Sequence, residues 1–158
     1  MACEGLIRAY SHNYGLNASV FRFANVIGSG MSHGVIVDFI DKLVGNPRSL
    51  EILGDGKQSK SYVLVEDVIE GILVGMVEDG FNVYNIGNED SISVDCVADL
   101  VCRCLTLDGV QKTYTGGKVG WVGDIPKVWL DCQKLRNLGW KPSKNSEEAV
   151  VEAIESLI

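Results

Sequence analysis

The chain has 158 residues, about the length of one domain, with 46% hydrophobic and 22% charged residues. This composition is typical of a folded globular protein and excludes collagen-like, low-complexity and disordered chains. The formal net charge is −7, from 14 basic and 21 acidic side chains. No basic run could follow a phosphate backbone, so we expect no nucleic-acid partner.

The cysteine pattern favours a reducing compartment. The five cysteines form an odd set without a C-x-x-C pair, which buried, reduced thiols explain best. His12 and His33 form no close cluster with cysteine, so we expect no metal site. No apolar stretch reaches the length of a membrane span and no secretory leader is evident. We therefore expect a cytoplasmic protein without a membrane partner.

Apolar periodicity predicts that helices and strands alternate along almost the whole chain, which indicates an α/β fold. Gly15 is expected to end the first helix, and Ser93 to cap a later one. The predicted elements are, in order, helix 3–14, strand 18–27, helix 35–44, strands 50–53 and 61–65, helix 66–78, strand 81–87, helix 94–105, strand 111–114, an irregular segment 115–129, and helices 131–138 and 146–158.

The predicted core follows the apolar stripes of these helices. Trp129 and Trp140 are expected to join it. In helix 66–78 the residues expected to face inward are Val68, Ile69, Ile72, Leu73 and Met76.

One glycine-rich loop could bind a dinucleotide. Residues 28–34 read G-x-G-x-x-x-G between a strand and a helix, with Glu51 or Asp55 roughly 20 residues further on. A plain turn is the favoured alternative, because Arg22 and Asn25 would place polar groups in the preceding strand.

Tyr114 and Lys118 have the Tyr-x-x-x-Lys spacing of a catalytic pair, in which lysine lowers the pKa of the tyrosine. That pairing needs one turn of helix. The intervening Thr115-Gly116-Gly117 disfavours a helix, so we interpret the match as accidental.

The segment 54–68 places a glycine turn, a lysine and a tyrosine before a helix, a layout that suits an anionic ligand. Lys60 and Tyr62 alternate onto one side of their strand, although an exposed edge-strand lysine is the alternative. Asn25, at the end of its strand, is either a ligand contact or a structural amide. Lys118 and Asp124, in the irregular segment, are either ligand contacts or solvated side chains.

Several motifs together resemble one known family in their order and spacing. They are Arg22-Phe23-Ala24-Asn25-Val26-Ile27-Gly28, Gly34-Val35-Ile36, Leu53-Gly54-Asp55-Gly56, Lys60-Ser61-Tyr62-Val63, Val65-Glu66-Asp67-Val68, Tyr84-Asn85-Ile86-Gly87, Gly123-Asp124-Ile125-Pro126 and Leu138-Gly139-Trp140-Lys141-Pro142. On these motifs the chain resembles, over essentially all of its length, the C-terminal half of the extended short-chain dehydrogenase/reductases. These are the NAD-dependent nucleotide-sugar epimerases and dehydratases.

The resemblance implies the C-terminal part of a Rossmann-like extended short-chain dehydrogenase fold plus its small substrate-binding α/β domain. Residues 1–34 would be the tail of the Rossmann-like domain, with one helix and one strand. Residues 35–158 would be mostly the sugar-nucleotide-binding domain. The N-terminal NAD-binding part, with the glycine-rich loop and the catalytic Tyr-x-x-x-Lys, would be absent, so we expect this chain alone to be inactive.

The resemblance also implies roles for particular residues in binding the nucleotide. Asn25 would bond the diphosphate region, while Gly34 and Val35 would offer backbone groups to the ligand. The remaining implied contacts are Glu51 and Leu53 flanking the base, Tyr62 lining the pocket, and Asp124 holding a ribose hydroxyl.

Two lysines and one phenylalanine complete the implied site. Lys60 and Lys118 stand where the family has arginines, which keeps the charge but loses bidentate phosphate geometry. Phe23 would lie near the nicotinamide of NAD.

The resemblance implies that the chain is the UDP-sugar-binding portion of an NAD-dependent sugar 4-epimerase. Such an enzyme oxidises C4 of the sugar, lets the 4-keto intermediate rotate and returns the hydride. NAD and a UDP-sugar are the expected cofactor and ligand, and a homodimer is the expected full-length assembly. The alternatives are a nucleotide-sugar dehydratase or reductase of the same family, and a non-catalytic ligand-binding module.

Overall fold

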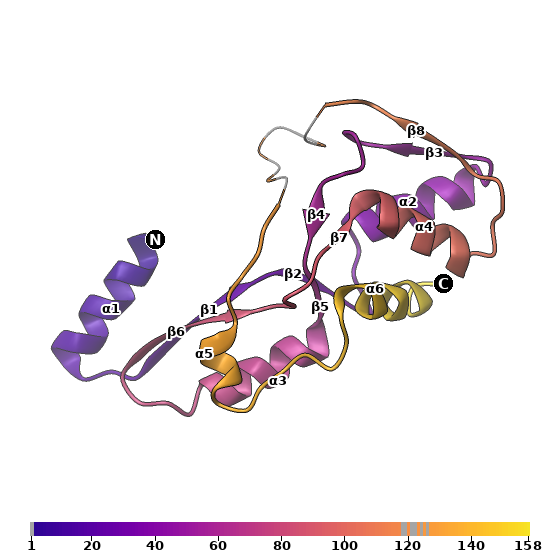
Figure 1. Cartoon of the computed structure of the whole chain (residues 1–158). Helices are drawn as coiled ribbons and strands as arrows, with labels where there is room; N and C mark the ends of the chain where they lie inside the picture. Colours follow the sequence, from indigo (N-terminus) through magenta and orange to yellow (C-terminus); the bar gives the residue numbers. More distant parts are fainter. Residues whose placement is uncertain (1, 118–119, 121–122, 124, 126) are drawn as a thin grey trace.

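The structure, a computed structural model, describes residues 2–117, 120, 123, 125 and 127–158. Helices and strands alternate along the chain, and the described strands form parallel or antiparallel pairs rather than one broad sheet. Figure 1 shows the helix at the N-terminus at one end of the molecule and the C-terminal helix near the other. The predicted α/β architecture is confirmed.

Most helices and strands lie close to their predicted positions, whereas the two short strands β4 and β7 were not predicted. The helices are α1 (Ala2–Tyr14), α2 (Val35–Gly45), α3 (Val65–Gly75), α4 (Val94–Cys104), α5 (Gln133–Arg136) and α6 (Ser146–Glu155). The strands are β1 (Ala18–Phe23), β2 (Asn25–Ile27), β3 (Ser49–Ile52), β4 (Ser59–Lys60), β5 (Tyr62–Leu64), β6 (Phe81–Ile86), β7 (Ile92–Ser93) and β8 (Gln111–Tyr114).

The helix ends follow the expected local chemistry. Gly15 adopts a φ of 65°, and the backbone N–H of Leu16 donates to the carbonyl of Ser11 over 3.2 Å, which closes α1 as a glycine C-cap does. Ser93 caps α4 by accepting from the backbone N–H of Cys96 over 3.1 Å. Helices α3, α5 and α6 are shorter than predicted, although the residue after each of them keeps right-handed helical backbone angles.

The strand predicted at 18–27 is divided at Ala24, and the two parts pair with different strands. β1 runs parallel to β6, whereas β2 runs parallel to β5. The backbone N–H of Ala24 still donates to Ile86, over 2.9 Å, but that of Asn25 donates to Ser61, over 3.1 Å. A change of partner leaves no mark on a run of β-forming residues, so the sequence pattern could not reveal it.

A second change of partner occurs on the neighbouring segment. β4 pairs antiparallel with β7, Ser61 interrupts the strand, and β5 then pairs with β2. The two junctions, at Ala24 and Ser61, therefore lie side by side. From them β1 and β4 diverge in different directions (Figure 1).

Two clusters of buried residues form the core. In the larger cluster α2, α4 and α6 pack against β3, together with Tyr62 and Leu64 of β5. The smaller cluster lies around β6 and α3 and includes Tyr84, Leu135 and Trp140. The burial predicted for Trp140 is confirmed, whereas the burial predicted for Trp129 is wrong, since that side chain is exposed.

The inward face predicted for α3 is wrong at three of its five positions. Ile69, Leu73 and Met76 are each more than half exposed, although Val68 is buried and Ile72 packs against the core. The face that packs on the core instead carries two glycines. A Cβ on Gly75 would lie 2.7 Å from Cε1 of Phe21, so the helix approaches β1 more closely than any side chain would allow. Hydropathy scores glycine as neutral and could not identify this face.

Helix α1 also exposes its apolar stripe. Leu6, Tyr10 and Tyr14 are exposed, and the helix is joined to β1 by an ion pair between Arg22 and Glu4, with 2.6 Å between Nη2 and Oε2. The hydrogen bond from Arg22 holds the pKa of Glu4 below its usual range. Arg22 therefore points away from the core, which explains how a charged residue is accommodated in β1.

Candidate ligand-binding site

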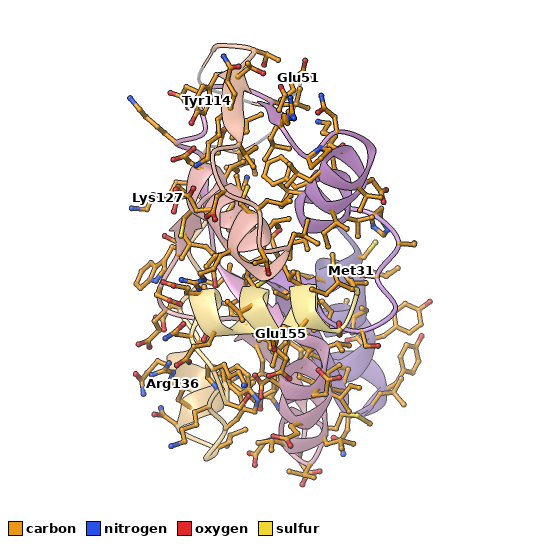
Figure 2. All side chains as sticks on the ribbon, turned by 90° about the vertical axis from the view of Figure 1, so that its right-hand side faces the viewer. Met31, Glu51, Tyr114, Lys127, Arg136 and Glu155 are labelled. Atoms are coloured by element: carbon orange, nitrogen blue, oxygen red, sulfur yellow. The ribbon has the colours of Figure 1, made fainter. Side chains whose placement is uncertain are left out.

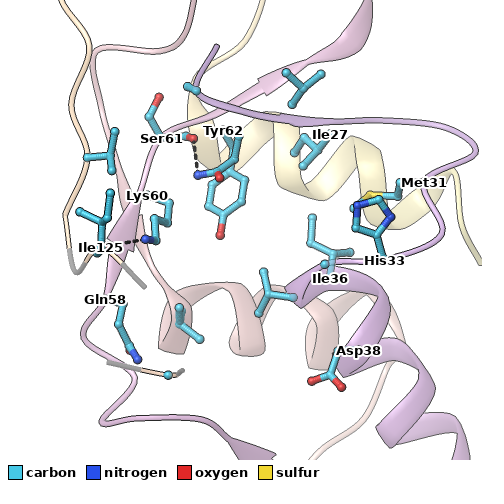
Figure 3. A pocket seen from close by; sticks show the side chains of 18 of the residues that line it. Ile27, Met31, His33, Ile36, Asp38, Gln58, Lys60, Ser61, Tyr62 and Ile125 are labelled. Atoms are coloured by element: carbon cyan, nitrogen blue, oxygen red, sulfur yellow. Dashed lines mark hydrogen bonds between the residues drawn. The ribbon is translucent and has the colours of Figure 1, made fainter. Parts of the chain in front are cut away.

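A cavity of about 830 Å³ opens beside the two strand junctions, between β2, β4, β5 and the start of α2. Its walls also include residues from the segment that follows β8 (Figure 3). The described residues that line it are Phe23, Ala24, Asn25, Val26, Ile27, Met31, His33, Gly34, Val35, Ile36, Asp38, Phe39, Leu53, Gln58, Lys60, Ser61, Tyr62, Val94, Gly120, Gly123, Ile125, Val128 and Leu130.

Hydrogen bonds fix the two strand junctions, at Ala24 and Ser61, in the wall of this cavity. The side chain of Asn25 donates from Nδ2 to the carbonyl of Ser61 over 3.1 Å. The Ser61 hydroxyl donates to the carbonyl of Asn88 over 2.8 Å and accepts from its backbone N–H over 3.1 Å. Asn88 also donates from Nδ2 to the carbonyl of Tyr62 over 2.6 Å. Three distant segments thus position Asn25 and Tyr62 against each other.

Tyr62 is buried and anchors β5 to the C-terminal helix. Its backbone N–H donates to the hydroxyl of Ser146 over 3.1 Å, and Ser146 in turn hydrogen bonds to the carboxylate of Asp90. The same tyrosine lines the cavity. The wall on this side is therefore supported by buried, satisfied polar groups, which favours a rigid site.

Lys60 crosses the cavity wall next to this junction. Its side chain is half-buried, and Nζ donates to the backbone carbonyl of Ile125 (Figure 3). This contact joins β4 to the segment after β8. An ammonium group has three donor positions, so the same lysine is chemically able to contact an anion in the cavity as well.

The start of α2 supplies a second group suited to an anion. Gly34 occupies the N-cap position with a φ of 104° and, within the described part of the chain, its helix start has no side-chain cap. The first backbone N–H groups of a helix carry partial positive charge and bind anions. Gly34, Val35 and Ile36 all line the cavity, so these donors lie at its wall.

The far part of the cavity lies beside Leu53, where β3 has just ended. Gln58 is buried there, with 2% of its surface exposed. Its Nε2 donates to the carbonyl of Leu53 over 3.1 Å. Leu53, Gln58 and Gly120 form this end of the cavity.

The structure brings most of the sequence-predicted site residues together. Those that line the cavity are Phe23, Asn25, Gly34, Val35, Leu53, Lys60 and Tyr62. Glu51 lies outside the described cavity lining, on an exposed position of β3, where its carbonyl accepts from Nζ of Lys42 over 3.2 Å. Figure 2 shows Glu51 far from the cavity residue Met31. Lys118 and Asp124 lie outside the described residues.

Sequence reasoning missed several cavity residues, of which Gln58 and Ser61 are the most polar and buried. A signal for Gln58 was available. Alternation along a strand places residues two apart on one side, so extending the Lys60 and Tyr62 pattern backwards reaches Gln58. Asp38 and His33 at the start of α2 carried no such signal.

Local packing accounts for the first glycine of the 28–34 loop. A Cβ on Gly28 would lie 2.8 Å from Cγ1 of Val65, so the close approach of this loop to α3 requires glycine. Gly34 is required by the left-handed turn before α2.

Tyr114 belongs to a polar cluster away from the cavity. It lies on β8, not on a helix, and its hydroxyl donates to Oδ1 of Asp95 over 2.5 Å. This bond raises the pKa of Tyr114, the opposite of what a catalytic tyrosine needs. Burial pushes the pKa of Asp95 upward, but the hydrogen bonds from Tyr114 and Lys112 outweigh burial and leave it below its usual range.

The described residues contain neither a cluster of metal ligands nor a helix that could span a membrane. No group of three or more His, Cys, Asp or Glu side chains there could hold a metal ion. None of the described helices is both long and apolar enough to cross a bilayer. The five cysteines are free thiols, and the predicted burial holds for Cys102 and Cys132 but is wrong for Cys3, which is exposed.

Comparison with protein families matches residues 1–87, just over half of the chain, to the NAD dependent epimerase/dehydratase family. The chain belongs to this family. Membership agrees with the motif order that runs from Arg22 to Gly87, including the junction at Asn25 and the Lys60-Ser61-Tyr62 segment that line the cavity.

Individual members of the epimerase/dehydratase family match nearly the whole chain. A UDP-glucuronate 4-epimerase of Thermodesulfobacterium geofontis is 26% identical over 154 residues, which are 96% of this chain and 46% of the relative. A trifunctional enzyme of Arabidopsis thaliana is 32% identical over 157 residues, which are 96% of this chain and 23% of the relative. Its three named activities are UDP-glucose 4,6-dehydratase, UDP-4-keto-6-deoxy-D-glucose 3,5-epimerase and UDP-4-keto-L-rhamnose-reductase.

The fold matches a solved member of the family closely. The crystal structure of a UDP-glucose 4-epimerase with UDP-glucose from Thermotoga maritima superposes with a TM-score of 0.84 at 28% identity. The match covers 99% of this chain and 50% of that one. The extended short-chain dehydrogenase fold is therefore confirmed, and the chain spans at most about half the length of the curated relatives that it matches.

Proposed function

We propose that this chain is the sugar-nucleotide-anchoring part of an NAD-dependent UDP-sugar 4-epimerase. The observation that carries the proposal is that residues from four separate stretches, predicted as site residues from motifs alone, line a single cavity. They include Phe23 and Asn25, Gly34 and Val35, Leu53, and Lys60 and Tyr62.

The size of the cavity supports a ligand of this class. Small-molecule sites usually enclose about 300–1,000 Å³. At about 830 Å³ the cavity is large enough for an extended ligand with several polar groups, such as a sugar nucleotide. Its walls are mostly apolar, with a few polar side chains at defined positions, which is the usual composition of a specific site.

The charges near the cavity suit a diphosphate in an otherwise acidic protein. The net charge of −7 repels anions at long range, so a diphosphate must be held by local groups. Lys60 supplies a cation, and the uncapped start of α2 supplies backbone donors. Asn25 lies between them at the strand junction. We assign the diphosphate to this part of the cavity.

Phe23 and Val26 are suited to the nicotinamide end. Phe23 is 46% exposed at the end of β1, and Val26 is exposed beside it on β2. Both line the cavity and offer an apolar surface against which a planar ring can pack. When bound, NAD supplies a hydride acceptor and donor for C4 of the sugar. The residues of this chain hold the nucleotide so that the sugar points to Phe23 and away from Leu53.

Epimerases and dehydratases of the family both match at least 96% of the chain, and we propose the 4-epimerase because the family member crystallised with UDP-glucose is a 4-epimerase. A dehydratase binds a similar nucleotide and would differ in the acid–base groups that act on the sugar. The cavity described above fits the nucleotide of either enzyme. The assignment to UDP-sugar binding therefore has more support than the assignment to one reaction.

An NMR titration of the chain with UDP-glucose, UDP and NAD tests the proposal. We expect UDP-glucose and UDP to shift the backbone amide signals of Asn25, Val35 and Lys60, with little change at α1, which lies away from the cavity. Saturation at those residues by UDP but not by adenosine diphosphate, which has the same diphosphate, would support a uridine site. If neither uridine ligand shifts these signals, the proposal is wrong.

A further inference from the structure

One of the two histidines of the chain lies at the cavity, directly before α2. His33 lines the cavity together with Gly34, Val35 and Ile36, which form the start of this helix. Figure 3 shows its imidazole beside Met31 at the same end of the helix. The side chain is exposed, and it has no hydrogen bond or ion pair with another residue that the structure describes. Its ring nitrogens are therefore available to a ligand in the cavity.

The position of His33 places it beside the expected anion. A diphosphate held by Lys60 and by the first N–H groups of α2 would lie next to the residue that precedes this helix. A positive charge at a helix N-terminus is unfavourable on its own, because the helix end already carries partial positive charge. A bound anion compensates both charges. Protonation of His33 and binding of an anion should therefore favour each other.

The other ionisable side chains around His33 come from the elements that surround it. Among the described residues they are Asp38 on α2, Lys60 on β4, Tyr62 on β5 and Glu66 at the start of α3. Asp38 is paired with Lys42, with 2.8 Å between Oδ2 and Nζ. Glu66 approaches the loop that leads to His33, since its Oε2 would lie 3.7 Å from a Cβ on Gly28. Ordinary carboxyl, tyrosine and lysine groups titrate below about pH 5 or above about pH 9, whereas an imidazole changes its charge between these limits.

We propose that the protonated imidazole of His33 is a further contact for the diphosphate of the bound sugar nucleotide and makes its binding depend on pH. The inference rests on the proposed function, because it requires an anion between Lys60 and the start of α2. The imidazolium attracts the diphosphate and can donate a charge-assisted hydrogen bond to it. The affinity is therefore highest at acidic pH and falls as the imidazole loses its proton.

Calorimetric titration of the chain with UDP-glucose between about pH 5.5 and about pH 8 tests this inference. UDP-glucose is preferred to UDP, because a terminal phosphate loses its second proton near about pH 6, whereas the charge of UDP-glucose stays constant over this range. We expect UDP-glucose to bind about 3- to 10-fold more tightly at the acidic end in dilute salt, with a smaller difference at high salt. Equal affinity across the range would overturn the inference and leave the proposed function in place.

Three variants assign the pH dependence to one side chain. His33→Gln keeps a hydrogen-bond donor but carries no charge, so it should bind at acidic pH as weakly as the unmodified chain binds at alkaline pH. His33→Arg is charged throughout and should bind tightly at every pH. His12→Gln, on α1 and outside the cavity lining, removes the other histidine and should retain the pH dependence.

The variants and the ligand separate the possible failures. A pH dependence that persists in His33→Gln would arise from another group and would refute the inference. If the unmodified chain does not bind UDP-glucose at any pH in this range, the proposed function fails, and the inference fails with it.

Discussion

Replacing Lys60 with alanine tests the centre of the proposed nucleotide site most directly. Lys60 lines the cavity, whereas Lys57, three residues earlier in the same segment, is exposed and outside the described cavity lining. The two substitutions remove the same charge from neighbouring positions. Any change in long-range attraction is therefore common to both variants, and only Lys60→Ala removes a direct contact.

The expected loss follows from the environment of the ammonium group. A charge-assisted hydrogen bond contributes about 1.5–3 kcal/mol, more than a neutral bond. Lys60 is half-buried, which limits screening, but it also donates to the carbonyl of Ile125 and must share its donors with the ligand. We therefore expect a loss near about 2 kcal/mol, which corresponds to about 30-fold weaker UDP binding.

Isothermal titration with UDP at low and high salt measures this loss. Lys60→Ala should bind about 30-fold more weakly than the unmodified chain and should lose part of the salt dependence, while Lys57→Ala should stay close to the unmodified chain. Lys60→Arg should retain binding, because a guanidinium can contact two phosphate oxygens. Equal losses in the two alanine variants would refute the direct contact. No loss in Lys60→Ala would mean that the lysine serves only to hold Ile125.

Three further predictions concern packing, acid stability and thiol reactivity. Gly75→Ala should lower the free energy of unfolding by about 1–3 kcal/mol, because the new Cβ would lie 2.7 Å from Phe21. Gly5→Ala, with open space around its Cβ, should not destabilise the protein. Urea denaturation measures both variants. The pKa of Asp95 is lowered in the folded state, so its contribution to stability is present above about pH 4 and is lost as the pH falls through the folded pKa. In a plot of the free energy of unfolding against pH, Asp95→Asn should therefore reduce the slope on the acid side. An unchanged slope would contradict this prediction. Iodoacetamide should label exposed Cys3 before Cys102 and Cys132, whose pKa values are raised by burial, and peptide mass spectrometry would contradict this if all three reacted at one rate.

Helix positions could be predicted from the sequence more reliably than helix faces. The apolar stripe of α4 is unambiguous, since its apolar residues alternate with charged ones, and Val97 and Val101 on this stripe are buried. Helix α3 is apolar on several sides, so the periodicity pointed to Leu73 and Met76 although both are exposed. The face of α3 that packs inward carries Gly71 and Gly75, and because these residues have no side chain the helix can approach its neighbours closely. A hydropathy pattern records the side chains that are present and cannot record a close backbone approach.

The same reasoning explains which parts of the site were predicted. Lys60 and Tyr62 follow from two-residue alternation, and Asn25 from its place at the end of a strand. Both arguments are local. Burial of Gln58 depends on the carbonyl of Leu53 and on Gly120, which returns to the cavity 62 residues later in the chain. No local pattern contains that contact, so a buried acceptor at this position could be found only in the folded structure.

The hydrogen bonds at the strand junction should keep the shape of the cavity constant, although loops form part of its wall. Ser61 stands at the break between β4 and β5, yet its hydroxyl has both a donor and an acceptor role toward Asn88, and its carbonyl accepts from Asn25. Ser61 is thus committed to structure, which leaves its neighbour Lys60 and the remaining surface of Asn25 to meet a ligand. The two bonds between Ser61 and Asn88 are buried, so breaking one of them would leave a buried polar group without a partner. The angle between β1 and β4, and with it the distance from Phe23 to Gln58, is therefore set by the hydrogen bonds at this junction. A substitution at the junction should change the orientation of a bound ligand before it disturbs the folded core.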